Sequence, residues 1–397
     1  MGKINVICPW IILGLTMGGM TACNKDKGLT DTDKGNMNTE RVVFEIKTEG
    51  NNSPASNNEE AGDGQMPDAF LVKKEQEYYS LMDNAGDAWK SDGNSGYTLS
   101  KNLKIGKYHF AIMKGMKRVN SAQEGNMGNL CYIDTQNYKY NSLQDIEIVH
   151  PYENGMLKDC NMLYMDKNEN KLAEVVDLTG NGDGKDNHSF NAELNHAQAR
   201  VDVIVVKAVK NNQGGYEIMD ENPFENNKIS DITLTFSGIN NACKLENSLF
   251  YKKDNVPTSY MKTIKAEDFA DFDYNEYKKG FKGNDPFNGN EKLEMLTDEG
   301  LNNVKIFDKG IYLFPTQENR NDKIEFKLTV NYNKDTGLDP TEGVIKDGIE
   351  ELNRNNVRLI VVWLLNEKFE VVPDIDVSNE LPDYENGVAA GDEGFWN

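Results

Sequence analysis

Strict alternation of apolar and polar residues is the sequence feature that most constrains how this chain folds. From Ile324 to Tyr332 every even position is apolar and every odd position is polar. The same period recurs in residues 231–236, and Val42, Phe44 and Ile46 follow it in residues 42–47. Alternation with a period of two puts one face of a β-strand on a core and the other in water. The sequence therefore predicts a mainly β protein.

Many short strands are predicted along the rest of the chain, separated by turns rich in Asn and Gly. The further candidates are residues 107–113, 145–149, 172–178, 200–208 and 304–314. Strands of this length and spacing are typical of β-sandwiches with antiparallel connections. Helical patterns are few, and we expect short helices at 73–83 and 341–353.

Two segments near the C-terminus have different patterns. Residues 357–365 are almost continuously apolar, which predicts a strand that is buried on both faces. Residues 369–377 alternate again, but Pro373 removes one backbone donor from the ladder. We therefore expect this second strand to lie at a sheet edge or to contain a bulge.

The N-terminus has the pattern of a lipoprotein signal. Lys3 precedes an apolar run over residues 4–19, which is shorter than the roughly 20 residues of a membrane span. Small residues end at Ala22, and Cys23 follows. We expect cleavage between Ala22 and Cys23 and a stable membrane anchor from acyl chains on Cys23. The alternative is an ordinary secretory signal beside which Cys23 is incidental.

Composition and length divide the chain into segments, and the net charge limits its partners. Residues 1–22 form the predicted signal peptide, and the polar residues 23–40 form a flexible tether. The remaining length suggests an N-terminal domain over 41–215 and a C-terminal domain over 216–397. With 43 basic and 65 acidic residues the net charge is −22, which argues against a nucleic-acid partner because phosphate binding needs a basic surface.

Three cysteines remain after the signal and the lipid site: Cys131, Cys160 and Cys243. An odd number is not a complete disulfide framework. The sequence leaves two alternatives, one bridge between Cys131 and Cys160 or three buried thiols.

No catalytic motif is present. The four histidines lack metal-site spacing, and there is no nucleophile elbow, phosphate loop or dinucleotide fingerprint. We therefore expect no catalytic residues and no enzyme activity, and a lipid-anchored hydrolase is disfavoured.

Calcium is the one cofactor with a candidate site, in the Gly-rich stretch 177–186. Its oxygen ligands would be Asp177, Asn181 and Asp183. The EF-hand pattern fails because His188 stands where a bidentate Glu is needed. The alternative is an Asn-Gly hairpin turn between a strand ending at Leu178 and one starting near Phe190.

Several motifs follow one another along the chain. They are the signal that ends in Thr-Ala-Cys23, residues 103–110 (Leu-x-x-Gly-x-Tyr-x-Phe) with a Gly-x-Tyr strand entry, residues 194–203 with Ala-Arg-Val, residues 312–315 (Tyr-Leu-Phe-Pro) and residues 355–357 before an apolar strand. Together they resemble the motifs of the fimbrillins, the lipoprotein pilins of Bacteroidales-type bacteria.

This resemblance implies two β-sandwich domains of transthyretin-like topology, exported to the cell surface and anchored in the outer membrane by lipid. It also implies a structural subunit of a fimbria that supports adhesion, with other fimbrial subunits as partners. In that family a protease removes the first strand, and a neighbour's C-terminal strand fills the groove by β-augmentation. Here residues 42–47 would be removed, and 357–365 or 369–377 would be donated.

One departure from the family concerns processing. Its shaft pilins are cut at an Arg after the first strand, whereas Arg41 precedes the strand predicted here. A protease of other specificity would cut at Lys47, Lys73 or Lys74. The resemblance therefore implies a shaft subunit cut by such a protease, or a tip or anchor subunit that keeps its lipid. A surface glycan-binding lipoprotein is a further alternative, with Trp89 and Trp396 as its aromatic residues.

Overall fold

The structure is a computed structural model in which the chain divides into two units, Met1–Asn38 and Thr39–Asn397. The residues that the structure describes all lie in the second unit. They are residues 39–48, 67–82, 89–91, 96–119, 128–135, 138–166, 172, 174–179, 188–211, 215–225, 228–279, 287–288, 290–297, 303–316, 323–349, 351–365 and 370–380. Among these residues, no helix is both long and apolar enough to cross a membrane.

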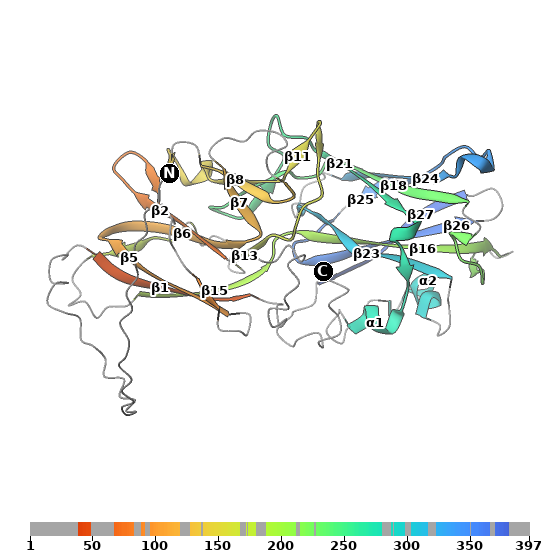
Figure 1. The fold of residues 1–397 in the computed structure, drawn as a ribbon, viewed down its shortest axis with the longest axis horizontal. Helices are drawn as coiled ribbons and strands as arrows, with labels where there is room; N and C mark the ends of the chain where they lie inside the picture. Colours follow the sequence, from red (N-terminus) through yellow and green to blue (C-terminus); the bar gives the residue numbers. More distant parts are fainter. Residues whose placement is uncertain are drawn as a thin grey trace, which may run out of the picture. The chain divides into compact units, whose positions relative to one another are not determined.

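The largest sheet has ten strands and is built from the first half of the chain (Figure 1). Its order is β4-β5-β1-β15-β13-β6-β2-β3-β9, and β14 also pairs with β6. The strands are β1 (Thr39–Thr48), β2 (Asp68–Lys74), β3 (Tyr79–Leu81), β4 (Lys90–Ser91), β5 (Gly96–Lys104), β6 (Gly106–Lys114), β9 (Lys139–Tyr140), β13 (Tyr164–Asp166), β14 (Val176–Leu178) and β15 (His188–His196).

A five-stranded sheet of order β20-β19-β10-β8-β7 packs against one face of the large sheet. Its strands are β7 (Met116–Val119), β8 (Cys131–Asp134), β10 (Glu147–Val149), β19 (Ala242–Lys244) and β20 (Leu249–Tyr251). The shared core includes Phe70 and Met113 from the large sheet and Ile133 and Ile148 from the smaller one. The 3-10 helix η3 (Leu143–Asp145) adds Leu143 to this core.

A second pair of sheets is built from the second half of the chain together with β11, β12 and β16. The six-stranded sheet β11-β12-β21-β18-β24-β25 packs on the sheet β22-β23-β16-β26-β27, to which β17 is added. The strands of the first are β11 (Tyr152–Glu153), β12 (Met156–Leu157), β18 (Ile229–Ser237), β21 (Ser259–Lys265), β24 (Ile324–Tyr332) and β25 (Thr341–Ile349). Those of the second are β16 (Ala199–Lys210), β17 (Tyr216–Ile218), β22 (Ala270–Asp271), β23 (Val304–Leu313), β26 (Asn356–Leu365) and β27 (Glu370–Glu380).

Two short helices cover the other face of the sheet that contains β26. They are α1 (Tyr274–Lys279) and α2 (Glu291–Glu294), and Figure 1 shows both beside β23 and β16. The remaining 3-10 helices are η6 (Ala266–Asp268), η7 (Met295–Thr297) and η8 (Lys334–Thr336). The core on this face includes Leu293 and Leu296 from the helical segment and Trp363 from β26. A mainly β fold with few short helices is therefore confirmed.

The alternating and apolar segments have the structures that their patterns predict. In β24 the buried residues are the even-numbered ones. In β26 every residue from Leu359 to Leu365 is buried, because α2 covers one face of its sheet and the β18 sheet covers the other. The strand β27 ends its sheet order, and its ladder with β26 shifts between Leu359 and Ile360. It is thus both an edge strand and a bulged one.

The expected helices at 73–83 and 341–353 are wrong. The first stretch continues β2, turns with a hydrogen bond from the Glu75 amide to the Tyr78 carbonyl (2.9 Å), and returns as β3. The second is β25, which pairs with β24. In both places pairing with a neighbouring strand overrides a weak local helix propensity, and Gly343 and Gly348 lower that propensity further.

The division into domains after residue 215 stays a prediction, and the sheets connect the two sides of it. The strand β16 precedes the boundary but pairs with β23 and β26. In the other direction, β19 pairs with β10, and β12 pairs with β21. Strands of each half thus complete sheets of the other.

Stability at mildly acidic pH should depend on His150. Its side chain is fully buried against Phe314 with a ring-centroid distance of 5.2 Å, and its Nδ1 lies 3.0 Å from the Pro151 carbonyl oxygen. Burial lowers the pKa of His150 to about 4. Below pH 6.5 the unfolded chain then binds a proton that the folded chain excludes, so stability falls as the pH falls towards 4. The expected loss is about 2 kcal/mol between pH 7 and pH 5.

Urea denaturation at a series of pH values measures how the free energy of unfolding changes with pH, which is the slope to compare. His150→Gln is the variant to compare with the parent. Glutamine takes up no proton, so the variant should lose less stability between pH 7 and pH 5 than the parent. Equal slopes in the parent and the variant would contradict the assignment. Some slope should remain in the variant, because burial also lowers the pKa of His109.

Candidate functional site

The strand β1 lies inside the large sheet although it is the first strand of the described chain. It pairs in antiparallel fashion with β5, from Thr39 opposite Lys104 to Lys47 opposite Gly96. On its other side it pairs in parallel with β15, from Val42 opposite His188 to Thr48 opposite Leu194. Figure 1 shows the three strands next to one another. In the sheet order β1 is also the strand that connects β4 and β5 to the remaining strands.

One face of β1 fills a core on the side of the large sheet away from the five-stranded sheet. Val42, Phe44 and Ile46 are each at most 2% exposed. The Phe44 ring meets Phe110 edge-on at 5.4 Å and stacks on Phe190 at 5.7 Å between centroids. Aromatic pairs in this distance range stabilise beyond the area that they bury.

Polar side chains add two contacts between β1 and its neighbours. The Nε2 of His188 in β15 lies 2.8 Å from the Oε2 of Glu40. On the other side the Nε of Arg41 donates to the Oγ of Ser100 in β5 over 2.8 Å. The sequence analysis missed Glu40, His188 and Ser100, because cross-strand partners depend on the register. The only indication of these contacts in the sequence was Glu40 itself, an acidic residue next to Arg41.

The predicted processing residues all lie in strands. Arg41 is exposed, but it is the third residue of β1, so the expectation that it precedes the strand is wrong. The strand begins earlier than predicted because Thr39 and Glu40 extend the ladder with β5. Lys47 is near the end of β1, and Lys73 in β2 forms an ion pair with Glu75 at 3.5 Å. Cleavage at any of these residues remains a prediction.

The C-terminal strands differ in how firmly they are held. The ladder of β26 runs parallel to β16 from Val357 to Leu365 and antiparallel to β27 on its other side. In contrast, β27 is the terminal strand of the sheet order, with Pro373 opposite Val362. Proline is compatible with an edge strand because the edge has a side without ladder hydrogen bonds.

Of the three candidate calcium ligands, the structure describes only Asp177. Asp177 lies in β14 and forms an ion pair with Lys107 at 3.6 Å. Asn181, Asp183, Ala22 and Cys23 lie outside the described residues. The strands on either side of the stretch do not form the alternative hairpin, since β14 pairs with β6 while β15 pairs with β1 and β13. Within the described ranges no group of three or more His, Cys, Asp or Glu residues is arranged to hold a metal ion.

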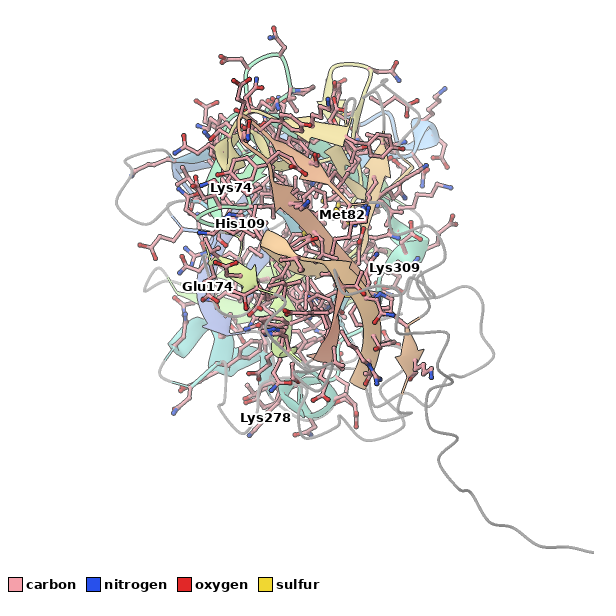
Figure 2. The ribbon with its side chains drawn as sticks, turned by 90° about the vertical axis from the view of Figure 1, so that its left-hand side faces the viewer. Lys74, Met82, His109, Glu174, Lys278 and Lys309 are labelled. Atoms are coloured by element: carbon pink, nitrogen blue, oxygen red, sulfur yellow. The ribbon has the colours of Figure 1, made fainter. Side chains whose placement is uncertain are left out.

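His109 in β6 is a buried residue of the core. Its Nδ1 lies 2.8 Å from the Leu172 carbonyl oxygen, and its ring meets Tyr79 edge-on at 5.5 Å. Figure 2 labels it between Lys74 and Glu174. Burial lowers the pKa of His109, and the charge of Lys74 lowers it further. The side chain is thus neutral at pH 7 and serves packing.

Among the described residues, no tryptophan forms the exposed aromatic platform that the glycan-binding alternative requires. Trp89 is half-buried and packs against the same core as Phe44. Trp363 is fully buried and stacks on Tyr216 at 4.9 Å. Trp396 lies outside the described residues.

No family model and no curated protein matches the chain. Several solved structures are similar to it. One is a fimbrial protein from Bacteroides vulgatus, 11% identical, with a TM-score of 0.39 over 85% of this chain and 99% of that one. Another is a candidate polysaccharide-binding protein from Bacteroides thetaiotaomicron, 12% identical, with a TM-score of 0.41 over 87% and 99%.

A third is a candidate cell adhesion protein from Bacteroides eggerthii, 10% identical, with a TM-score of 0.40 over 87% of this chain and 97% of that one. Adhesion and fimbrial proteins of these bacteria are the class that the sequence resemblance predicts.

Truncation of Phe44 should show how strongly β1 is held. Phe44→Ala removes the ring that packs on Phe110 and Phe190, so we expect a loss of about 3–5 kcal/mol in the free energy of unfolding. Val43→Ala is the matched control, because Val43 lies in the same strand with its side chain only partly buried. Urea denaturation measures both variants, and equal losses would show that the Phe44 face does not hold the strand.

Proposed function

We propose that this protein is a structural subunit of a cell-surface fimbria, exported as a lipoprotein and assembled by strand exchange. The observation that carries the proposal is the position of β1. It is an N-terminal strand, it lies between two others, and its loss divides a sheet. A strand placed in this way can be replaced by a strand from another chain.

Removal of β1 would leave a groove that requires a new strand. The facing edges of β5 and β15 would lose their ladder partners, and exposed edges of this kind pair with other chains. The pockets of Val42, Phe44 and Ile46 would open to water. Each of these side chains contributes about 1.5–3 kcal/mol by its burial, so refilling the groove is strongly favoured.

We propose β27 as the donated strand. It ends its sheet, so its release breaks the ladder with β26 and leaves the ladder between β26 and β16 in place. Release of β26 would instead expose both of its faces, including the fully buried Trp363. The sequence of β27 alternates as that of β1 does, with Val371, Ile375 and Val377 on odd positions. Alternating side chains in pockets provide specificity when a strand is added to a sheet.

The place of cleavage decides between a shaft subunit and an anchor or tip subunit. Because Arg41 lies inside β1, a cut after it would leave Val42 to Thr48 in the sheet and the groove closed. A cut at Lys47 or in residues 49–66, which contain no Lys or Arg, would free the strand. An uncut chain would keep its lipid and donate β27 without accepting a strand, as an anchor does.

Controlled cleavage tests the assembly proposal. A recognition sequence for a site-specific viral protease replaces residues 53–59 in the full chain. After cleavage and loss of β1, we expect ladders of polymers on a denaturing gel, because strand-exchanged subunits separate slowly. The uncut chain should remain monomeric, and when mixed with cut chains it should shorten the ladders by occupying one end.

Substitutions in β27 identify the donor. Cut chains with Ile375→Asp should stay monomeric, because a charge would have to enter an apolar pocket. The matched control Asp374→Asn, one residue away on the other side of the alternation, should polymerise like the parent. Cut chains that lose β1 and remain monomers would disprove strand exchange, and polymers of both variants would show that β27 is not the donor.

The lipid anchor is tested by metabolic labelling with radioactive palmitate. We expect label on the parent chain in the membrane fraction and none on Cys23→Ser, because the acyl chains are attached through the Cys23 thiol. The control Cys8→Ser changes a cysteine within the predicted signal and should retain the label. Equal labelling of Cys23→Ser would show that Cys23 is incidental to an ordinary signal.

A further inference from the structure

Two buried thiols meet in the core between the large sheet and the five-stranded sheet. The Sγ atoms of Cys131 and Cys160 are 3.1 Å apart. Cys131 begins β8 and is 0% exposed, and Cys160 lies four residues before β13 and is 8% exposed. A disulfide bond is about 2.05 Å long, so a movement of roughly 1 Å separates this contact from a bond.

The backbone on both sides of this pair is fixed independently of the sulfur atoms. The Asn161 amide donates to the Asn129 carbonyl oxygen over 2.6 Å, which joins the two segments directly beside the cysteines. Cys131 is paired with Met116 in β7. Gly115, with a φ of +81°, has no space for a Cβ because the Met162 carbonyl lies against it. The segments that contain Cys131 and Cys160 are therefore held side by side.

We propose that Cys131 and Cys160 are a disulfide pair that closes when the chain meets an oxidising dithiol–disulfide couple. This rests on the proposed function in one respect, because export would bring the chain to such a couple. The Cys160 thiolate attacks the disulfide R–S–S–R and releases one R–SH. The Cys131 thiolate then displaces the second R–SH from Cys160. Two thiols are thus oxidised to one disulfide, and one disulfide is reduced to two thiols.

The surroundings of the pair give the order of the two steps. Burial raises the pKa of the Cys131 thiol, and the neighbouring Cys160 adds to this, so Cys131 is a poor first nucleophile in the folded chain. Cys160 has the greater exposure of the two, 8% against 0%, so we assign the first attack to Cys160. All three cysteines are thiols in the structure, and we expect Cys243, fully buried in β19, to stay one.

Peptide mapping tests the pairing directly. Trypsin places the three cysteines in different peptides, residues 119–139, 159–167 and 229–244. The full chain is purified in detergent, incubated folded with oxidised glutathione, alkylated in denaturant and digested without reductant. We expect peptides 119–139 and 159–167 to be linked and peptide 229–244 to be alkylated. Alkylation of all three peptides, or a link to 229–244, would overturn the proposal.

The melting temperatures of cysteine variants give a second test of the pairing. Thermal melting of the oxidised parent should lie about 5 °C above that of Cys160→Ser, because the bond closes a long loop in the unfolded chain. The matched control Cys243→Ser should keep the link between peptides 119–139 and 159–167. Addition of a reductant should lower the melting temperature of Cys243→Ser and leave that of Cys160→Ser unchanged; a reductant effect of equal size in both would overturn the pairing.

Different experimental results would contradict the disulfide pairing and the proposed function. If the chain is not exported, palmitate labelling fails while the purified chain still closes the bond in oxidised glutathione. If the purified chain keeps three thiols, the disulfide proposal falls, and the polymer ladders of the cleaved chain remain a separate result.

Discussion

The packing of β1 into the large sheet is the interaction on which the first half of the structure depends. The sheet order places β4 and β5 beyond it, so β1 joins them to the other strands. Its apolar face also completes an aromatic group in which Phe110 and Phe190 lie 4.8 Å apart beneath Phe44. Under the proposed function, a cut that removes β1 would leave this sheet with a gap for a strand from another chain.

The second half of the chain is organised around β26, an inner strand that, unlike β1, is buried on both faces. This strand is buried on both faces and paired on both sides, so the sheet cannot release it without losing its core. The strand β27 lies outside it and adds one ladder. The sheet thus has an inner strand that is buried on both faces and, beside it, the terminal strand that we propose as the donor. The difference follows from sequence, since the one segment is continuously apolar and the other contains Pro373 and alternating polar residues.

Patterns of period two were sufficient to predict β1, β18 and β24, which bury alternate side chains. The continuous apolar run of 357–365 predicted β26 as a strand buried on both faces, and Pro373 predicted β27 as an edge or bulged strand. The helices expected at 73–83 and 341–353 are wrong, because strand pairing decided the structure of both segments. The alternating pattern also placed the start of β1 too late, because Thr39 and Glu40 are polar and join the strand through their ladder with β5. The contact between Glu40 and His188 spans 148 residues and depends on a parallel register that no local pattern contains.

In the proposed assembly, a bond between Cys131 and Cys160 would affect the sheet that remains after β1 has been removed. Cys160 leads into β13, and β13 is the strand that supports β15 on the side away from β1. Cys131 belongs to β8 in the opposing sheet. A bond between them would hold one wall of the groove to that sheet during the interval in which the groove is empty. The β5 wall has no such link to a cysteine, since Cys131, Cys160 and Cys243 all lie in other segments. The incoming strand would therefore order β5 against a wall that is already fixed, which lowers the entropy lost on binding.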